Sequence, residues 1–114
     1  MAVYVDDMYL YEMGRFGRMK MSHMVADTDE ELHTFAKQIG ISKRWWQSSE
    51  TTSGSHYDIC LSKRKQAISL GAIPITLKEC ACMNFRRKIT GNLGSPVDAV
   101  DWRKNYTKGC TVGN

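Results

Sequence analysis

The stretch from Asp27 to Gly40 constrains the fold of this chain more than any other part of the sequence. Its opening residues supply an N-cap, an acidic first turn and capping-box spacing, through either Thr28 and Glu31 or Asp27 and Glu30. Four apolar residues then recur at helical spacing: Leu32, Phe35, Ala36 and Ile39. Gly40 follows at a position suited to a left-handed cap. The pattern predicts an amphipathic helix over 28–39, which must bury its apolar stripe against another element.

Short apolar segments can form the sheet that such a helix needs. We predict strands over four ranges: 2–6, 21–26, 44–47 and 72–77, of which 44–47 also fits an aromatic loop. A second helix is predicted over 62–70, with Gly71 as its stop. Helices alternating with strands predict a small single α/β domain, with a sheet of about four strands packed with two main helices.

The length of 114 residues suits one domain with one modest core. We expect the α/β core domain to occupy residues 1–83. Periodicity fades after about residue 84. Residues 84–114 are therefore predicted to form an irregular C-terminal extension that packs on the core or serves assembly.

The lengths of the apolar runs and the spacing of the cysteines indicate in which cellular compartment the protein is expected. No apolar run approaches the roughly 18 residues of a membrane span, and Asp6 and Asp7 interrupt the apolar start before a secretory signal can form. These patterns predict a cytoplasmic protein with no membrane partner. We expect free thiols at the four Cys, because Cys80-x-Cys82 is their only close pair and common zinc sites use a different spacing.

Charge is spread unevenly along the chain. Residues 1–57 hold 6 basic and 8 acidic residues, whereas residues 58–114 hold 10 basic and 4 acidic residues. Lys63-Arg64-Lys65 falls in the first turn of the predicted helix 62–70, where cations are unfavourable unless an anion binds there. A second basic segment, with Arg15 and Arg18, has the glycines of a flexible loop. The charge pattern favours an anionic partner, although a solvated basic face gives the same pattern.

Histidine and acidic side chains gather at a few points of the predicted elements. Asp6 ends the first predicted strand, where crevices form in α/β sheets. His23 lies on the predicted strand 21–26, on one face with Met21 and Val25. His33 falls beside the centre of the helical stripe. The triplet His56-Tyr57-Asp58 lies just before the predicted helix 62–70.

Several of these motifs together resemble a family. The run Ser22-His23-x-Val25-x-Asp27-Thr28-x-x-Glu31-Leu32-His33-x-Phe35-Ala36, followed by Gly40, His56-Tyr57-Asp58 and Gly71-Ala72, resembles a domain family of unknown function in short bacterial and bacteriophage proteins. The resemblance covers about residues 1–80. It implies a shared site that contains His23, His33, His56, Tyr57 and Asp58, and it names no reaction. Many relatives have an Asp-Pro-Pro type of start, so Asp6 is a safer member of that site than Asp7.

The first functional interpretation is binding of a phosphorylated, nucleotide-like small molecule, with no metal or other cofactor. If the chain is phage-encoded, tight binding without turnover would sequester a nucleotide signal of host defence in the bacterial cytoplasm. The expected pocket residues are Asp6, Arg15, Arg18, His23, His33, His56, Tyr57, Asp58, Lys63 and Arg64.

Other interpretations use the same residues differently. A divalent metal bound by His23, His56, Asp58 and Asp6 would make the protein a metal-dependent phosphoesterase or nuclease, although no two His have close metal-ligand spacing. Alternatively, His56-Tyr57-Asp58 caps and packs in a structural or interaction protein. Nucleic acid is a less favoured partner, because basic runs of three are common. The sequence allows a homo-oligomer and leaves open whether the protein is an enzyme.

Overall fold

The chain folds as a layered α/β domain, described by a computed structural model of residues 2–52 and 54–112. Residues 1 and 53 of the predicted core domain and residues 113–114 of the predicted extension lie outside these ranges. Helices and strands in chain order are β1 (Val3–Val5), β2 (Arg15–Phe16), β3 (Met19–Ala26), α1 (Asp29–Gln38), β4 (Tyr57–Cys60), α2 (Leu61–Ser69), β5 (Ile73–Pro74), α3 (Leu77–Thr90) and α4 (Ala99–Val112). Three short 3-10 helices accompany them: η1 (Met8–Leu10), η2 (Glu12–Gly14) and η3 (Lys43–Trp45).

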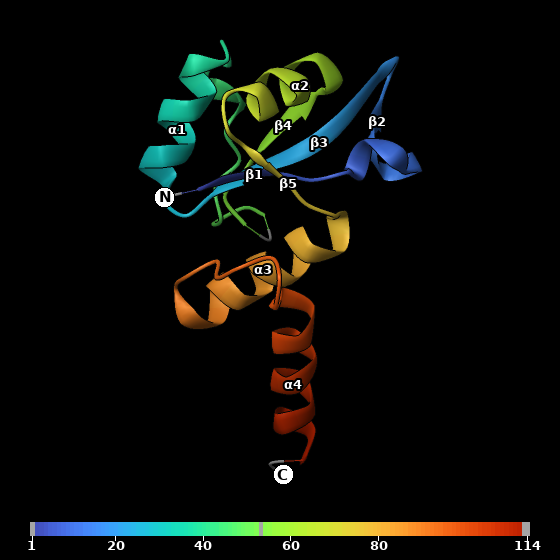
Figure 1. Cartoon of the computed structure of the whole chain (residues 1–114), viewed down its shortest axis with the longest axis vertical. Coiled ribbons are helices and arrows are strands. Elements are labelled where there is room, and N and C mark those ends of the chain that lie inside the picture. The colour runs from blue at the N-terminus through green and yellow to red at the C-terminus, as the bar shows by residue number, and fades with distance from the viewer. Residues whose placement is uncertain (1, 53, 113–114) are drawn as a thin grey trace.

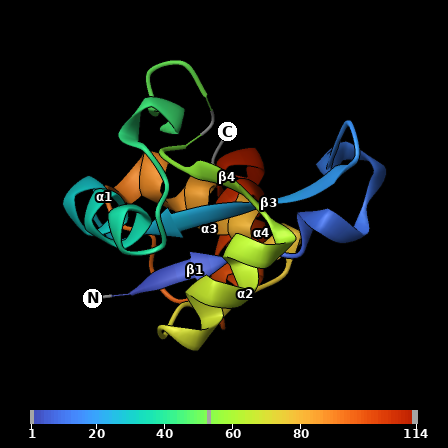
Figure 2. The ribbon, with the colours of Figure 1, turned by 90° about the horizontal axis from the view of Figure 1, so that it is seen from above.

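The strand β3 organises the five-stranded sheet. It pairs in antiparallel fashion with β1, β2 and β4, and β5 lies parallel to β1. Figure 1 shows α1 and α2 on one side of the sheet and α3 on the other, with α4 projecting away from the body. Seen from above in Figure 2, β3 runs through the middle of the molecule and out into the β2–β3 hairpin.

Each face of the sheet carries its own apolar cluster. Alternate residues of β1 and β3 supply Val3, Val5, Met24 and Ala26 to the cluster under α1 and α2. The residues between them, Tyr4 and Val25, belong to the second cluster, with Cys80, Met83 and Leu93 on the side of α3. A three-layer arrangement follows, because both faces of the sheet are apolar and need cover.

The predicted α/β class and the first helix are confirmed. The hydroxyl of Thr28 accepts a hydrogen bond from the backbone N–H of Glu31 at 3.2 Å, and α1 follows directly. Gly40 adopts a φ of 78°, which is the left-handed conformation expected of it. β1 and β3 lie in the predicted strands 2–6 and 21–26, and α2 lies within one residue of the predicted helix 62–70.

The strand prediction over 44–47 is wrong, and two strands were missed, the short β2 and β4. The hydroxyl of Ser42 accepts from the N–H of Arg44 and begins the 3-10 helix η3, so Gln47 keeps only an isolated bridge to His56. The longer of the two is β4, which pairs with β3 from Met21 to Met24. Its residues alternate between buried and half-exposed, starting from a buried Tyr57, which is the pattern of a strand with two different faces.

The prediction of an irregular C-terminal extension is also wrong. Thr76 and Glu79 form a capping box that begins α3, so the predicted strand 72–77 shrinks to Ile73–Pro74. Buried Cys80, Cys82 and Met83 supply the apolar side of α3, where small thiols act as hydrophobes. Aromatic rings then join α4 to α3, with Phe85 5.8 Å from Tyr106. No helix within residues 2–52 and 54–112 combines the length and apolarity that crossing a bilayer requires.

Candidate metal centre

The pairing of β3 with β4 places His23 directly opposite Asp58. Cross-strand partners share one face of a sheet, and this face is the one that α3 partly covers, because Val25 also points to it. Met24 and Tyr57, the next pair along the ladder, point to the opposite face. Strand alternation thus brings an imidazole and a carboxylate together at one edge of the α3-side cluster.

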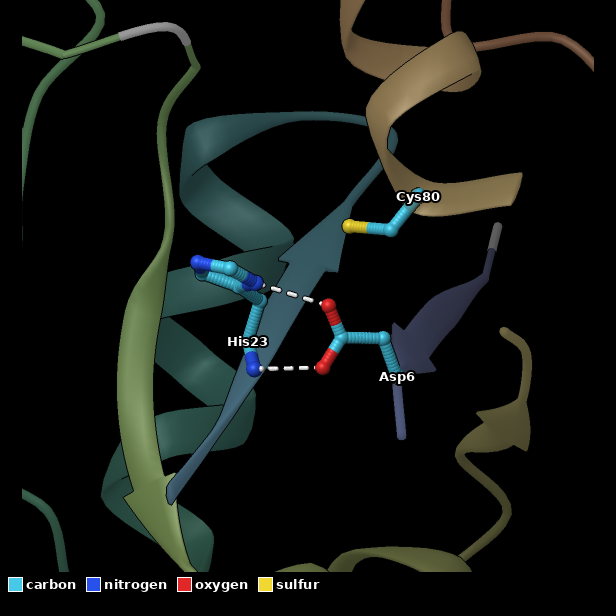
Figure 3. Close-up of side chains that lie close together, drawn as sticks. All are labelled: Asp6, His23 and Cys80. Carbon is cyan, nitrogen blue, oxygen red and sulfur yellow. Dashed lines mark hydrogen bonds and ion pairs between the residues drawn. The ribbon is translucent and has the colours of Figure 1, made fainter. Parts of the chain in front are cut away.

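Asp6 orients His23 from the neighbouring strand end. Its side chain is fully buried, and its Oδ1 accepts hydrogen bonds from the backbone N–H groups of Met8 at 3.1 Å and His23 at 2.8 Å. Its Oδ2 lies 2.7 Å from His23 Nδ1. Figure 3 shows this contact, with the buried Cys80 thiol alongside. Because these oxygens accept, Nδ1 of His23 carries the proton, and the lone pair of the neutral ring is on Nε2.

His56 approaches the same point from the residue before β4. A pair of backbone hydrogen bonds with Gln47 fixes its main chain, and its ring lies edge-on to His23 with the centroids 5.0 Å apart. Nδ1 of His56 lies 2.6 Å from the carbonyl oxygen of Gly54. A carbonyl only accepts, so Nδ1 is the donor and Nε2 again has the free lone pair.

Asp58 completes the cluster formed by His23, His56 and Asp58, hereafter the His–His–Asp cluster. Its Oδ2 accepts a hydrogen bond from Gln47 Nε2 at 2.7 Å. Its Oδ1 is buried and has no hydrogen-bond partner among the described residues. Burying a carboxylate oxygen without a partner costs free energy, so this atom points to a missing partner.

The distances in the His–His–Asp cluster suit a shared cation better than hydrogen bonds. Asp58 Oδ1 lies 3.5 Å from His56 Nε2 and 3.8 Å from His23 Nε2. Both exceed the 2.7–3.2 Å of an N–H···O bond. Two ligand atoms at about 2.1 Å from a tetrahedral zinc are about 3.4 Å apart. All three ligand atoms lie within 4.8 Å of one another, so a single ion can reach them.

Electrostatics favour a cation at this point. Burial works to lower the pKa of His23, but the hydrogen bond with Asp6 and the negative charges of Asp6 and Asp58 outweigh it, and the net shift is upward. The two carboxylates therefore create a field that stabilises positive charge near His23. A second proton and a metal ion would compete for the lone pair on His23 Nε2.

A second group of possible ligands, Asp6, His23 and Cys80, is chemically less suited to a metal. The Asp6 oxygens already accept three N–H groups, one of them from His23 Nδ1. Burial raises the pKa of the Cys80 thiol far above its usual range, with the Asp6 charge adding to the effect. A metal needs the thiolate, so Cys80 serves better as a packed neighbour of Asp6.

Tyr57 and His33 lie together on the other face of the sheet. The ring of Tyr57 is fully buried among α1 and α2, and its hydroxyl is 2.8 Å from His33 Nδ1. Their membership of a binding pocket stays a prediction. The structure separates these two residues from the His–His–Asp cluster by the thickness of the sheet.

The four predicted basic residues are dispersed. Lys63 Nζ donates to the carbonyl of Ile39 at the end of α1, and Arg64 Nε donates to the carbonyl of Asp6 at 2.8 Å. Arg64 also lies over the ring of Tyr9, 4.8 Å from its centroid. Arg15 and Arg18 are exposed on the β2–β3 hairpin and its turn. Anion binding by these side chains stays a prediction, and two of them have structural partners.

Sequence reasoning missed three groups that support the cluster: the amide of Gln47, the carbonyl of Gly54 and the thiol of Cys80. Each acts through a contact between distant segments or through the backbone, which leaves no local motif.

The fold and the cluster define the class: a small three-layer α/β domain with two imidazoles and one carboxylate converging at a sheet edge. The chain belongs to the family described as protein of unknown function DUF4031, whose family model matches residues 3–87. This confirms the resemblance to a domain family of unknown function. The match begins at β1 and ends within α3, so α4 lies beyond it. No curated protein and no solved structure matches this chain.

Proposed function

We propose that this domain binds one divalent transition-metal ion through His23 Nε2, His56 Nε2 and Asp58 Oδ1, and uses it to hydrolyse a phosphoester. One observation carries the proposal: a buried carboxylate oxygen without a partner faces two imidazole nitrogens whose protons are held on the opposite side of each ring. Supporting groups of this kind commonly orient metal ligands in proteins, and here Asp6, Gly54 and Gln47 provide them.

The ligand set fits catalytic chemistry. Two His and one carboxylate suit zinc, iron or manganese, and three protein ligands leave coordination positions for water and substrate. The side chains of His23 and Asp58 are 25% and 35% exposed, so the cluster is partly accessible to solvent, although Asp58 Oδ1 itself is buried. A metal there would lower the pKa of bound water and polarise a phosphoryl oxygen. The basic C-terminal half of the chain favours an anionic substrate.

Metal-free sequestration of a nucleotide-like ligand uses the same region without turnover, and it ranks second. That function needs free cations at the start of α2, where Lys63 and Arg64 already donate to backbone carbonyls. Incubation with a nucleotide panel, followed by heating and analysis of the released molecules, separates the two functions. An intact ligand supports sequestration, whereas a product that disappears with chelator supports hydrolysis.

The metal site is tested by calorimetric titration of chelator-stripped protein with Zn²⁺, Mn²⁺ and Fe²⁺. We expect one ion per chain and a loss of affinity of more than about 100-fold in Asp58→Asn, because the amide carries no charge for the ion. Asp98→Asn is the matched control. Asp98 is an exposed carboxylate that pairs only with Arg86 among the contacts described, 3.1 Å away.

Turnover is tested with the metal-loaded protein and bis(p-nitrophenyl) phosphate. We expect hydrolysis that stops on chelation, resumes on addition of metal and is absent in Asp58→Asn. Equal metal affinity in Asp58→Asn and the parent protein would overturn the metal site. Metal binding without hydrolysis of this ester or of any nucleotide in the panel would overturn the catalytic part alone.

A further inference from the structure

A groove of about 580 Å³ lies beside the His–His–Asp cluster. Asp58 is part of its lining, and so is Gln47, which holds Asp58 Oδ2. One wall comes from the β2–β3 hairpin, which reaches out from the body of the molecule in Figure 2. The opposite wall comes from the segment between α1 and Gln47. The volume is in the range of small-molecule pockets, and Asp58 belongs both to the groove and to the proposed metal site.

Large apolar side chains line both walls without cover. The hairpin side presents Met13, Phe16 and Met19, which are 67%, 71% and 47% exposed. Trp45, which is 59% exposed, faces them from η3. Exposed apolar residues gathered in one concave place commonly mark a binding site. Aromatic rings on facing walls suit a flat apolar group.

Cations accompany the aromatic walls. Arg15 lines the groove, and the guanidinium of Arg44 lies 5.0 Å from the centre of the Trp45 ring. Lys63 also lines it, but its Nζ donates to the carbonyl of Ile39. Asp58 is the acidic residue of the lining, and in the metal-loaded protein its charge would be compensated by the ion. The groove then combines aromatic walls with positively charged side chains on or beside those walls. This combination is complementary to a planar ring attached to a phosphate.

We propose that the groove binds nucleoside phosphate esters, with the base between Phe16 and Trp45 and the phosphate directed at the His–His–Asp cluster. The proposal rests on the proposed function, because it names the substrate class of the same site. In the reaction, water oxygen forms a bond to phosphorus and releases a proton to solvent, while the ester P–O bond breaks and the departing oxygen takes up a proton from solvent. Trp45 and Phe16 would set specificity without touching the reacting atoms.

The test compares two diesters with the same leaving group, methyl p-nitrophenyl phosphate and thymidine 5′-(p-nitrophenyl phosphate), on metal-loaded protein. We expect kcat/KM to be about tenfold or more higher for the thymidine ester, because base stacking adds binding energy. Trp45→Ala should remove most of that preference. Val97→Ala is the matched control, because Val97 is a 91% exposed apolar residue outside the groove.

A binding measurement keeps this proposal separate from the proposed function. Thymidine monophosphate is titrated into metal-free and metal-loaded protein by calorimetry, in the parent and in Trp45→Ala. Binding that Trp45→Ala weakens supports the groove even where neither ester is hydrolysed, a result that would overturn hydrolysis alone. Equal kcat/KM for the two esters, or thymidine monophosphate binding unaffected by Trp45→Ala, would overturn the groove. A dimer that Phe16→Ala dissociates, with no nucleotide binding, would overturn it as well and assign the apolar walls to a protein interface.

Discussion

The two faces of the sheet differ in the side chains that cover them. Under α1 and α2, the described side chains form one continuous apolar cluster, and its polar group, the Tyr57 hydroxyl, is hydrogen-bonded to His33. On the side of α3, the apolar cluster gives way to polar side chains, with Asp6 just after β1, His23 within β3 and Asp58 within β4. The first face is complete by itself, whereas the second contains a buried oxygen that the described chain does not satisfy. The contrast separates stabilising residues from candidate functional ones.

The largest expected effect of a single change is on the apolar face. Leu32→Ala should lower the free energy of unfolding by about 2–5 kcal/mol, because Leu32 is 1% exposed and its loss leaves a cavity. Metal affinity should stay unchanged at temperatures where the variant is folded. Urea unfolding in chelator and calorimetric titration measure the two quantities. Thr34→Ala, an exposed position on the same helix, is the control. Weaker metal binding in folded Leu32→Ala would show that the two faces are coupled.

Asp6→Asn is expected to have a smaller effect, and to change mainly metal affinity rather than the free energy of unfolding. Metal affinity should fall by about 10–100-fold, because a neutral amide accepts the hydrogen bond from His23 Nδ1 more weakly than the carboxylate does. Asp7→Asn is the matched control, because Asp7 Oδ1 accepts from the N–H of Leu77 at the start of α3 and contacts no member of the His–His–Asp cluster by hydrogen bond. Circular dichroism reports folding, and titration reports affinity. Equal losses of affinity in both variants would mean that position 6 acts only through the fold.

The smallest expected effect comes from the third histidine. His33→Ala should lower the free energy of unfolding by about 1 kcal/mol, through loss of the hydrogen bond to Tyr57. Metal binding and ester hydrolysis should not change, because His33 is on the opposite face from Asp58. Thermal unfolding with and without metal tests this. A loss of activity in folded His33→Ala would place His33 in the site, as the sequence-based prediction has it.

Local determinants explain which parts of the fold could be predicted. The cap at Thr28, the apolar stripe and Gly40 all lie within one segment, so α1 was predicted almost to the residue. The start of α3 was equally local, with Thr76 and Glu79 in capping-box spacing, but the apolar run before it suggested a longer strand. Aromatic side chains hold α4 against α3, because Trp102 and Tyr106 both contact Phe85. Their i, i+4 spacing is visible in the sequence, but their partner lies on another helix.

The sequence predicts which residues belong to the candidate site, but it does not predict their positions relative to one another. His23, His56, Asp58 and Asp6 were all named, because imidazoles and carboxylates are the groups that carry chemistry. Their geometry depends on the register of β3 with β4, which joins segments far apart in the chain. Without β4, nothing in the sequence reveals that neighbouring residues such as Tyr57 and Asp58 point to opposite faces.

The parallel pairing of β1 with β5 has a consequence for how the chain is made. Tyr4 aligns with Ile73, and the N–H of Ile75 donates to the carbonyl of Val5. During translation, β1 leaves the ribosome before β5 and therefore keeps one edge unpaired until residues near 75 have followed it. Such an edge is open to pairing with other chains, and contacts this distant in sequence form slowly. The order of synthesis thus differs from the order of assembly, and the nascent chain is exposed to mispairing until β5 emerges.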